Sequence, residues 1–286
     1  MPGTQYVKRY TIVRGVTKRN RGDAPASKPR RAMISRHLQS ILAAVLVTAA
    51  TASPSAESLR GEMSLSATAH ELLGDDSANL FGTALDPDEV IEWEIYVPAD
   101  YDPGSPAGLL VFISPTESGK MPRRYQPVLD EKNLIWIGAN HSGNRVRVAR
   151  RVSLALLATA LADRDYRIDA SRVYVSGFSG GGRTASAVAP EYAQIFTGAI
   201  YICGVNFWDG RKPKRLDRVR ENRYVFLTGR KDFNRSETRR VHRAYQRADV
   251  ENVLLLEVPG MDHRMPPVED LATAISFLDS GPARDW

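Results

Sequence analysis

Residues 172–182, Arg-Val-Tyr-Val-Ser-Gly-Phe-Ser-Gly-Gly-Gly, place a serine where its hydroxyl could act as a nucleophile. Ser179 is the centre of a Gly-x-Ser-x-Gly motif whose glycines are Gly177 and Gly181. An apolar run precedes the motif and a helix-compatible segment, 183–189, follows it, so a strand turns sharply into a helix. At such a turn the N–H of Gly180 faces a developing oxyanion. The pattern predicts a serine nucleophile, and the alternative is a plain glycine-rich turn. A phosphate-binding loop is excluded because the Gly-Lys-Ser/Thr ending of such a loop is missing.

This motif and its flanks resemble the α/β-hydrolase superfamily, in which an acid and then a histidine follow the serine along the chain. A serine hydroxyl needs such a base, and the base needs a third group to orient it. Two histidines follow Ser179. His242 lies in a basic helical segment that we expect to be exposed, whereas His263 follows an apolar strand and precedes the last helix. His263 is therefore the predicted base.

A carboxylate stands just beyond the preceding strand, in Thr-Gly-Arg-Lys-Asp, which ends at Asp232. Asp209 and Asp249 have poorer positions, and Asp262 is adjacent to His263, where two side chains seldom face each other. Asp232 is the predicted acid; the alternative is an ordinary turn residue.

A second oxyanion donor is expected from the loop after the strand at 109–113. Pro115 has no N–H and cannot serve. The N–H of Thr116 is the predicted donor, with Ser114 as the alternative.

Four stretches narrow the resemblance to the secreted esterase branch that includes feruloyl esterases and polyhydroxyalkanoate depolymerases. They are residues 95–102, 166–181, 229–232 and 260–263, so the likeness spans about residues 89–278. It implies an esterase that needs no cofactor and forms an acyl-enzyme. Ser114-Pro115 departs from the His-Gly that this branch usually carries.

Apolar runs alternate with helical segments along the rest of the chain. Runs at 90–97, 109–113, 134–137, 173–176, 199–203, 224–228 and 253–258 predict strands, and segments 151–162, 237–249 and 268–278 predict helices. In the first helix, Val152, Leu156 and Ala160 are expected to share an apolar face with Leu157 and Leu161. The order predicts an α/β fold, a mainly parallel sheet with helices on both faces, for a catalytic domain at 89–286. Segment 53–88 supports no prediction.

The net charge of +6 is concentrated at the start of the chain. Residues 1–36 hold ten of the 39 basic residues and one of the 33 acidic ones, so the remainder is slightly acidic. The rest of the chain lacks the positive electrostatic potential that would attract the phosphate backbone of a nucleic acid, so nucleic acid is excluded as its partner. The single cysteine, Cys203, and five scattered histidines predict neither a disulfide nor a metal site, and Cys203 is expected to be a buried strand residue without chemistry.

Residues 1–32 have no apolar period and are expected to be unstructured. Segment 33–52 combines a basic start, a ten-residue apolar run and small residues, the pattern of a secretory signal peptide. Cleavage is expected after Ala52, or else after Ala56, and Met33 is a candidate for the true start. The prediction is a secreted or periplasmic protein that meets the membrane only through this segment. The alternatives are a membrane tether by an uncleaved signal anchor and an ordinary buried helix.

Two loops border the predicted site. Residues 140–144 are expected to form either a pocket rim or a polar loop. Phe207, Trp208 and Asp209, followed by the basic run 211–223, are expected to form a solvated surface segment rather than a substrate-binding cap.

The leading hypothesis is an exported serine esterase that acts on a small or polymeric ester. A serine peptidase is the alternative enzyme, although no propeller or gating domain is recognised beside the catalytic unit. A hydrolase fold without activity, serving as a binding protein of the cell envelope, is the third hypothesis.

Overall fold

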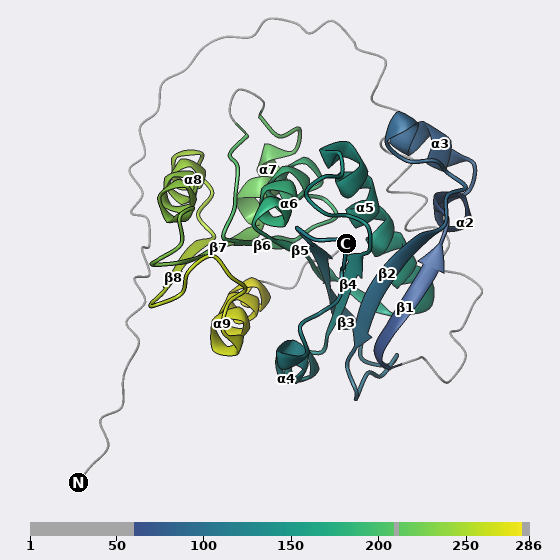
Figure 1. Ribbon diagram of the computed structural model, residues 1–286, viewed down its shortest axis with the longest axis horizontal. Coiled ribbons are helices and arrows are strands. Elements are labelled where there is room, and N and C mark those ends of the chain that lie inside the picture. The colour runs from purple at the N-terminus through teal and green to yellow at the C-terminus, as the bar shows by residue number, and fades with distance from the viewer. Residues whose placement is uncertain (1–59, 209–211, 282–286) are drawn as a thin grey trace, which may run out of the picture.

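The computed structural model describes residues 60–208 and 212–281 of the protein (Figure 1). The predicted head and signal segment, and the carboxylate of Asp209, lie outside the described residues. Within the described part, no helix is long and apolar enough to cross a membrane.

Eight strands of the described chain form one sheet. In chain order they are β1 (Gly61–Ala67), β2 (Ile91–Val97), β3 (Ala107–Ile113), β4 (Leu134–Ala139), β5 (Ile168–Phe178), β6 (Gly198–Ile202), β7 (Arg223–Gly229) and β8 (Val253–Val258). Their order across the sheet is β1-β2-β4-β3-β5-β6-β7-β8. β1 and β2 run antiparallel to their neighbours, and all other pairs are parallel. The predicted mainly parallel sheet is confirmed.

Helices cover both faces of this sheet (Figure 1). α5 (Val148–Asp165), α6 (Gly180–Glu191) and α8 (Arg235–Arg247) pack on one face, and α4 (Gln126–Glu131) and α9 (Val268–Asp279) on the other. The described chain also contains the short helices α2 (Ala69–Leu73), α3 (Asp76–Phe81) and α7 (Leu216–Glu221), with 3-10 turns at Gly82–Ala84 and Arg123–Tyr125.

Strand β7 shows why the parallel strands have continuous apolar sequences. Tyr224 and Phe226 enter the core under α8, whereas Val225 and Leu227 enter the core under α9. Because successive side chains point to opposite faces and both faces are covered, every position of the strand is buried in an apolar layer.

The structure adds one strand to those expected from the sequence and refines the buried face of one helix. Segment 53–88, for which the sequence supports no prediction, contains β1, which pairs with β2 along its whole length. The sheet therefore begins before residue 89. In α5, two members of the predicted apolar face, Leu157 and Leu161, are fully buried, whereas the other three are partly buried because they lie at the edge of the face that the helix turns toward the sheet.

Candidate active site

Ser179 lies at the turn between β5 and α6 with φ 55° and ψ −118°. A positive φ is unfavourable for a residue with a β-carbon, and such strain persists where the surroundings impose it. Close backbone contacts impose it here. A β-carbon on Gly181 would lie 1.8 Å from the carbonyl oxygen of Ile113, and one on Gly204 would lie 2.2 Å from the carbonyl oxygen of Ser179. Only glycine fits at these two positions.

The turn brings Ser179 to His263, which lies between β8 and α9. His263 Nε2 lies 2.8 Å from Ser179 Oγ, and His263 Nδ1 lies 2.8 Å from Asp232 Oδ1. The three residues follow β5, β7 and β8, whose carboxyl ends meet at one edge of the parallel sheet. The structure thus places the predicted nucleophile, acid and base in one hydrogen-bonded row.

The Asp232 carboxylate is fully buried, with 0% of its side chain exposed. Thr228 Oγ1 donates to Oδ2 at 2.7 Å, and the N–H of Asn234 donates to Oδ1 at 3.0 Å. Burial raises the pKa of Asp232, but its hydrogen bonds, from Asn234 and Thr228 first and then from His263 and Cys203, outweigh burial and hold the pKa below its ordinary value. The carboxylate is therefore ionised at neutral pH and oriented from several sides.

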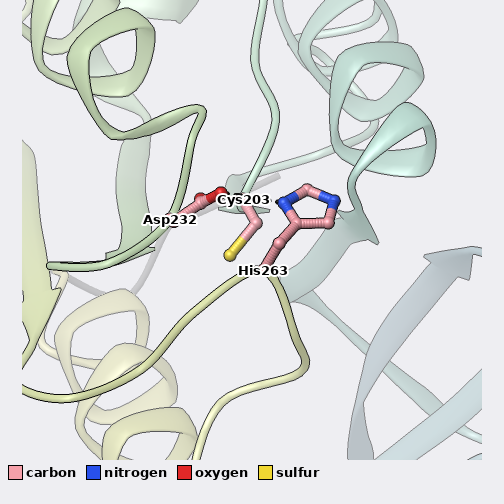
Figure 2. A group of neighbouring side chains, drawn as sticks. All are labelled: Cys203, Asp232 and His263. Carbon is pink, nitrogen blue, oxygen red and sulfur yellow. Dashed lines mark hydrogen bonds and ion pairs between the residues drawn. The ribbon is translucent and has the colours of Figure 1, made fainter.

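Cys203 borders this pair, and its thiol is buried as the sequence predicts, although the residue lies just after a strand and not within it. It follows β6 with φ 54°, and its thiol, the Asp232 carboxylate and the His263 ring offer ligand-type atoms within 4.8 Å of one another (Figure 2). Burial and the nearby carboxylate of Asp232 raise the pKa of the thiol. A cysteine binds a metal as the thiolate, which the raised pKa of Cys203 disfavours, and His263 Nδ1 is already hydrogen-bonded to Asp232 Oδ1. This cluster therefore fits a hydrogen-bond network better than a metal site.

Residues that the sequence did not single out hold the acid in place. Asn234 Nδ2 donates to the carbonyl of Cys203 at 2.8 Å, while Arg183 from α6 donates to Asn234 Oδ1 at 3.3 Å. The nearest signal in the sequence is the polar content of Thr-Gly-Arg-Lys-Asp-Phe-Asn around Asp232. That signal is weak because polar turns are common.

The competing candidates lie elsewhere. His242 is not exposed as predicted: it is 7% exposed, and its ring packs edge-on against Phe226 at 5.3 Å. Asp249 pairs with Arg220, and Asp262 pairs with Arg264. None of these side chains joins the row formed by Ser179, His263 and Asp232.

The predicted oxyanion segments lie side by side. Gly180 is the first residue of α6, where helical N–H groups have no intrahelical acceptor. The N–H of Thr116 donates to Ser114 Oγ at 3.1 Å, and the Thr116 hydroxyl lies 3.0 Å from the same oxygen. The predicted second donor is thus already engaged within its own loop.

The two bordering loops take different positions. A β-carbon on Gly180 would lie 2.0 Å from Asn144 Oδ1, so the loop at 140–144 meets the serine turn. The ring of Phe207 lies 4.4 Å from that of Trp208, and both pack on Tyr245 of α8. Residues 209–211, between this aromatic pair and the basic run, lie outside the described part of the chain.

No protein-family model matches the sequence, and no curated protein matches it either. Solved structures do. The feruloyl esterase module from Clostridium thermocellum, complexed with sinapinate as an S954A mutant, matches with a TM-score of 0.57 and 13% identity over 82% of this chain and 95% of that one. The poly(3-hydroxybutyrate) depolymerase from Bordetella parapertussis matches with a TM-score of 0.52 and 17% identity over 76% of this chain and 94% of that one.

A peptidase is also similar. Dipeptidyl peptidase 4 from Porphyromonas gingivalis matches with a TM-score of 0.51 and 18% identity over 68% of this chain but only 34% of the peptidase. At such identities the likeness extends to the fold and not to the substrate. Together with the strand order and the position of the serine turn, these matches show that the chain has the α/β-hydrolase fold.

Proposed function

We propose that this protein is a serine hydrolase that cleaves a carboxylic ester. The observation that carries the proposal is the position of His263, 2.8 Å from both Ser179 Oγ and Asp232 Oδ1. A histidine held between a hydroxyl and a buried carboxylate can accept the hydroxyl proton, since the carboxylate stabilises the imidazolium that results.

The proposed reaction has two halves. Ser179 Oγ attacks the ester carbonyl while His263 Nε2 takes its proton, and the tetrahedral intermediate collapses to an acyl-enzyme as His263 returns the proton to the leaving alcohol. Water, deprotonated by His263, then attacks the acyl-enzyme, and His263 returns that proton to Ser179 Oγ as the bond to the acyl group breaks and the acid is released. Asp232 stays ionised throughout.

Two N–H groups are assigned to the oxyanion. That of Gly180 lies at the N-terminus of α6, where the helix dipole favours negative charge. The N–H of Thr116, which donates to Ser114 Oγ, would also donate to the substrate oxygen in a three-centre hydrogen bond. No cofactor takes part in this mechanism.

The likeness in fold to a feruloyl esterase and to a polyester depolymerase supports an ester as substrate, small or polymeric. A peptidase with the same fold keeps amide cleavage as the second candidate. A catalytically inactive binding protein is the third, and it predicts an unreactive Ser179.

The test is to incubate the purified protein with a fluorophosphonate and to locate any adduct by mass spectrometry. We expect an adduct on Ser179, and turnover of p-nitrophenyl acetate that Ser179→Ala abolishes without changing the circular dichroism spectrum. A parallel assay with amino-acid p-nitroanilides distinguishes an esterase from a peptidase. A folded protein that forms no adduct and cleaves neither substrate would contradict the proposal.

We also propose that the chain is exported through the signal segment at 33–52. The support is the basic start, the ten-residue apolar run and the small residues at 50–52. N-terminal sequencing of the protein recovered from the producing cells should give Ser53 as the first residue, or Glu57 for the alternative cleavage site. An intact residue 33 in membrane fractions would indicate a tether instead.

A further inference from the structure

Arg151, the fourth residue of α5, is buried, and none of the carboxylates that the structure describes pairs with it. Only 3% of the residue is exposed, and among the described residues no acidic group lies within ion-pair distance of its guanidinium. Burial lowers the pKa of Arg151, but an arginine side chain still carries its charge at neutral pH. A buried, unpaired cation is costly, and an apolar side chain of similar size would serve the stability of the fold better.

The contacts of the guanidinium indicate what the charge does. Nη2 donates to the carbonyl oxygen of Ser114 at 2.8 Å, and Nη1 donates to the carbonyl oxygen of Gly180 at 3.2 Å. Its third nitrogen, Nε, has no acceptor among the residues that the structure describes. The hydrogen bonds that Arg151 makes therefore join the loop after β3 to the first turn of α6.

These two segments carry the N–H groups assigned to the oxyanion. Ser114 is joined to Pro115, whose nitrogen has no proton, so this peptide group can be held only through its carbonyl oxygen. Ser114 in turn accepts the N–H of Thr116 through its side chain. A shift of Ser114 would move Thr116, and a shift of the first turn of α6 would move Gly180.

From these contacts, and on the basis of the proposed serine hydrolase activity, we propose that Arg151 is a positioning residue for oxyanion stabilisation. Its planar guanidinium fork sets the spacing between the Gly180 and Thr116 donors, and its charge adds positive potential beneath them. Two carbonyls 29 and 37 residues away in the chain require two donors in a fixed geometry. Lysine, with one ammonium group, cannot hold both in this way.

The test compares Arg151→Lys and Arg151→Met with the same substitutions at Arg150. Arg150 is the matched control because it is the preceding residue of α5 and pairs with Glu89 at 2.6 Å, away from the oxyanion segments. Active sites are counted by fluorophosphonate titration, so that kcat refers to competent protein. We expect kcat for p-nitrophenyl acetate to fall about tenfold in Arg151→Lys and about a hundredfold in Arg151→Met, while KM changes less than about threefold.

A second readout separates positioning from folding. Phenylboronic acid forms a tetrahedral adduct with an activated serine, so its affinity should fall in parallel with kcat in the Arg151 variants and stay unchanged in the Arg150 variants. If Arg151→Met does not fold, Arg151→Lys decides alone. The inference would be overturned if the Arg151 variants had a lower melting temperature but the same kcat per titrated site and the same affinity for phenylboronic acid as the wild type. Wild-type protein with no turnover and no Ser179 adduct would instead overturn the proposed function.

Discussion

The phenyl ring of Phe233 stacks on the imidazole of His263, with ring centroids 4.2 Å apart and an interplanar angle of 29°. Phe233 is nevertheless 77% exposed. A large apolar side chain left in solvent beside the proposed base is suited to contact a substrate, because burial of its free face would then stabilise the complex. Phe178 contacts the same imidazole, with its centroid at 5.0 Å.

Phe233→Ala tests this contact. We expect KM for an aromatic ester such as naphthyl acetate to rise about three- to tenfold, the value of one aromatic contact, while KM for ethyl acetate changes little. Phe277→Ala is the control, since Phe277 packs on Arg223 at the start of β7, at the opposite end of the strand from Asp232. An equal effect on both esters would show that Phe233 only shields His263.

Asp232→Asn tests the acid. The amide keeps the shape of the carboxylate but lacks the charge that stabilises the imidazolium, and its NH2 group can donate to His263 Nδ1 and hold the ring in the wrong tautomer, so kcat should fall about 10⁴-fold with the fold intact. Asp262→Asn is the matched control because Asp262 precedes His263 in the chain and pairs with Arg264 on the surface. The measurement is ester turnover per folded molecule. Activity lost in Asp262→Asn and retained in Asp232→Asn would exchange the two assignments.

Thr228→Val removes one hydrogen bond to the Asp232 carboxylate without changing shape. The pKa of Asp232 is lowered in the folded state from its ordinary 3.8, so the ionised carboxylate stabilises the fold above pH 3.8, and this contribution declines below that pH and is lost as the pH falls through the lower pKa of the folded state. Removing the hydroxyl should lower the free energy of unfolding by about 2 kcal/mol at pH 7 and by less at pH 3, because the carboxylate that accepts the hydrogen bond becomes protonated as the pH falls. Urea titration at both pH values measures it.

Thr159→Val is the comparison for that experiment, because its hydroxyl donates to a neutral carbonyl, that of Leu156. Its effect on the free energy of unfolding should be the same at pH 7 and pH 3. A pH-independent effect of Thr228→Val would mean that the hydroxyl does not act through the charge of Asp232.

His242→Phe should change how stability depends on pH. Burial first, and the charge of Arg243 second, lower the pKa of His242 from 6.5 to about 4. The unfolded chain therefore binds a proton between pH 6.5 and 4 that the folded chain does not, so this histidine costs stability as the pH falls through that window. The wild type should lose about 3 kcal/mol more than the variant between pH 7 and pH 4. Equal losses in the two proteins would contradict the lowered pKa.

Much of the site was predictable from the sequence because its three residues each follow a recognisable strand. Gly-x-Ser-x-Gly after an apolar run, a carboxylate after the next-to-last strand and a histidine after the last one are local patterns. The fold class follows from the same alternation of strands and helices, since strands covered on both faces are apolar throughout. The catalytic roles of Ser179, Asp232 and His263 are hypotheses drawn from their order along the chain, and the substitutions proposed for Ser179 and Asp232 test them.

The tertiary structure alone decided which side chains surround that row. Cys203, Asn234 and Arg151 have no motif, because each acts through the carbonyl or carboxylate of a residue far along the chain. β1 was not predictable, since an edge strand with one partner needs no continuous apolar sequence. His242 was expected to be exposed because its neighbours are arginines, but helix geometry turns one face of this basic segment into the core, and His242 lies on that face with Val241 and Tyr245. Position along a chain specifies an element, whereas burial and hydrogen bonding depend on what the fold brings against it.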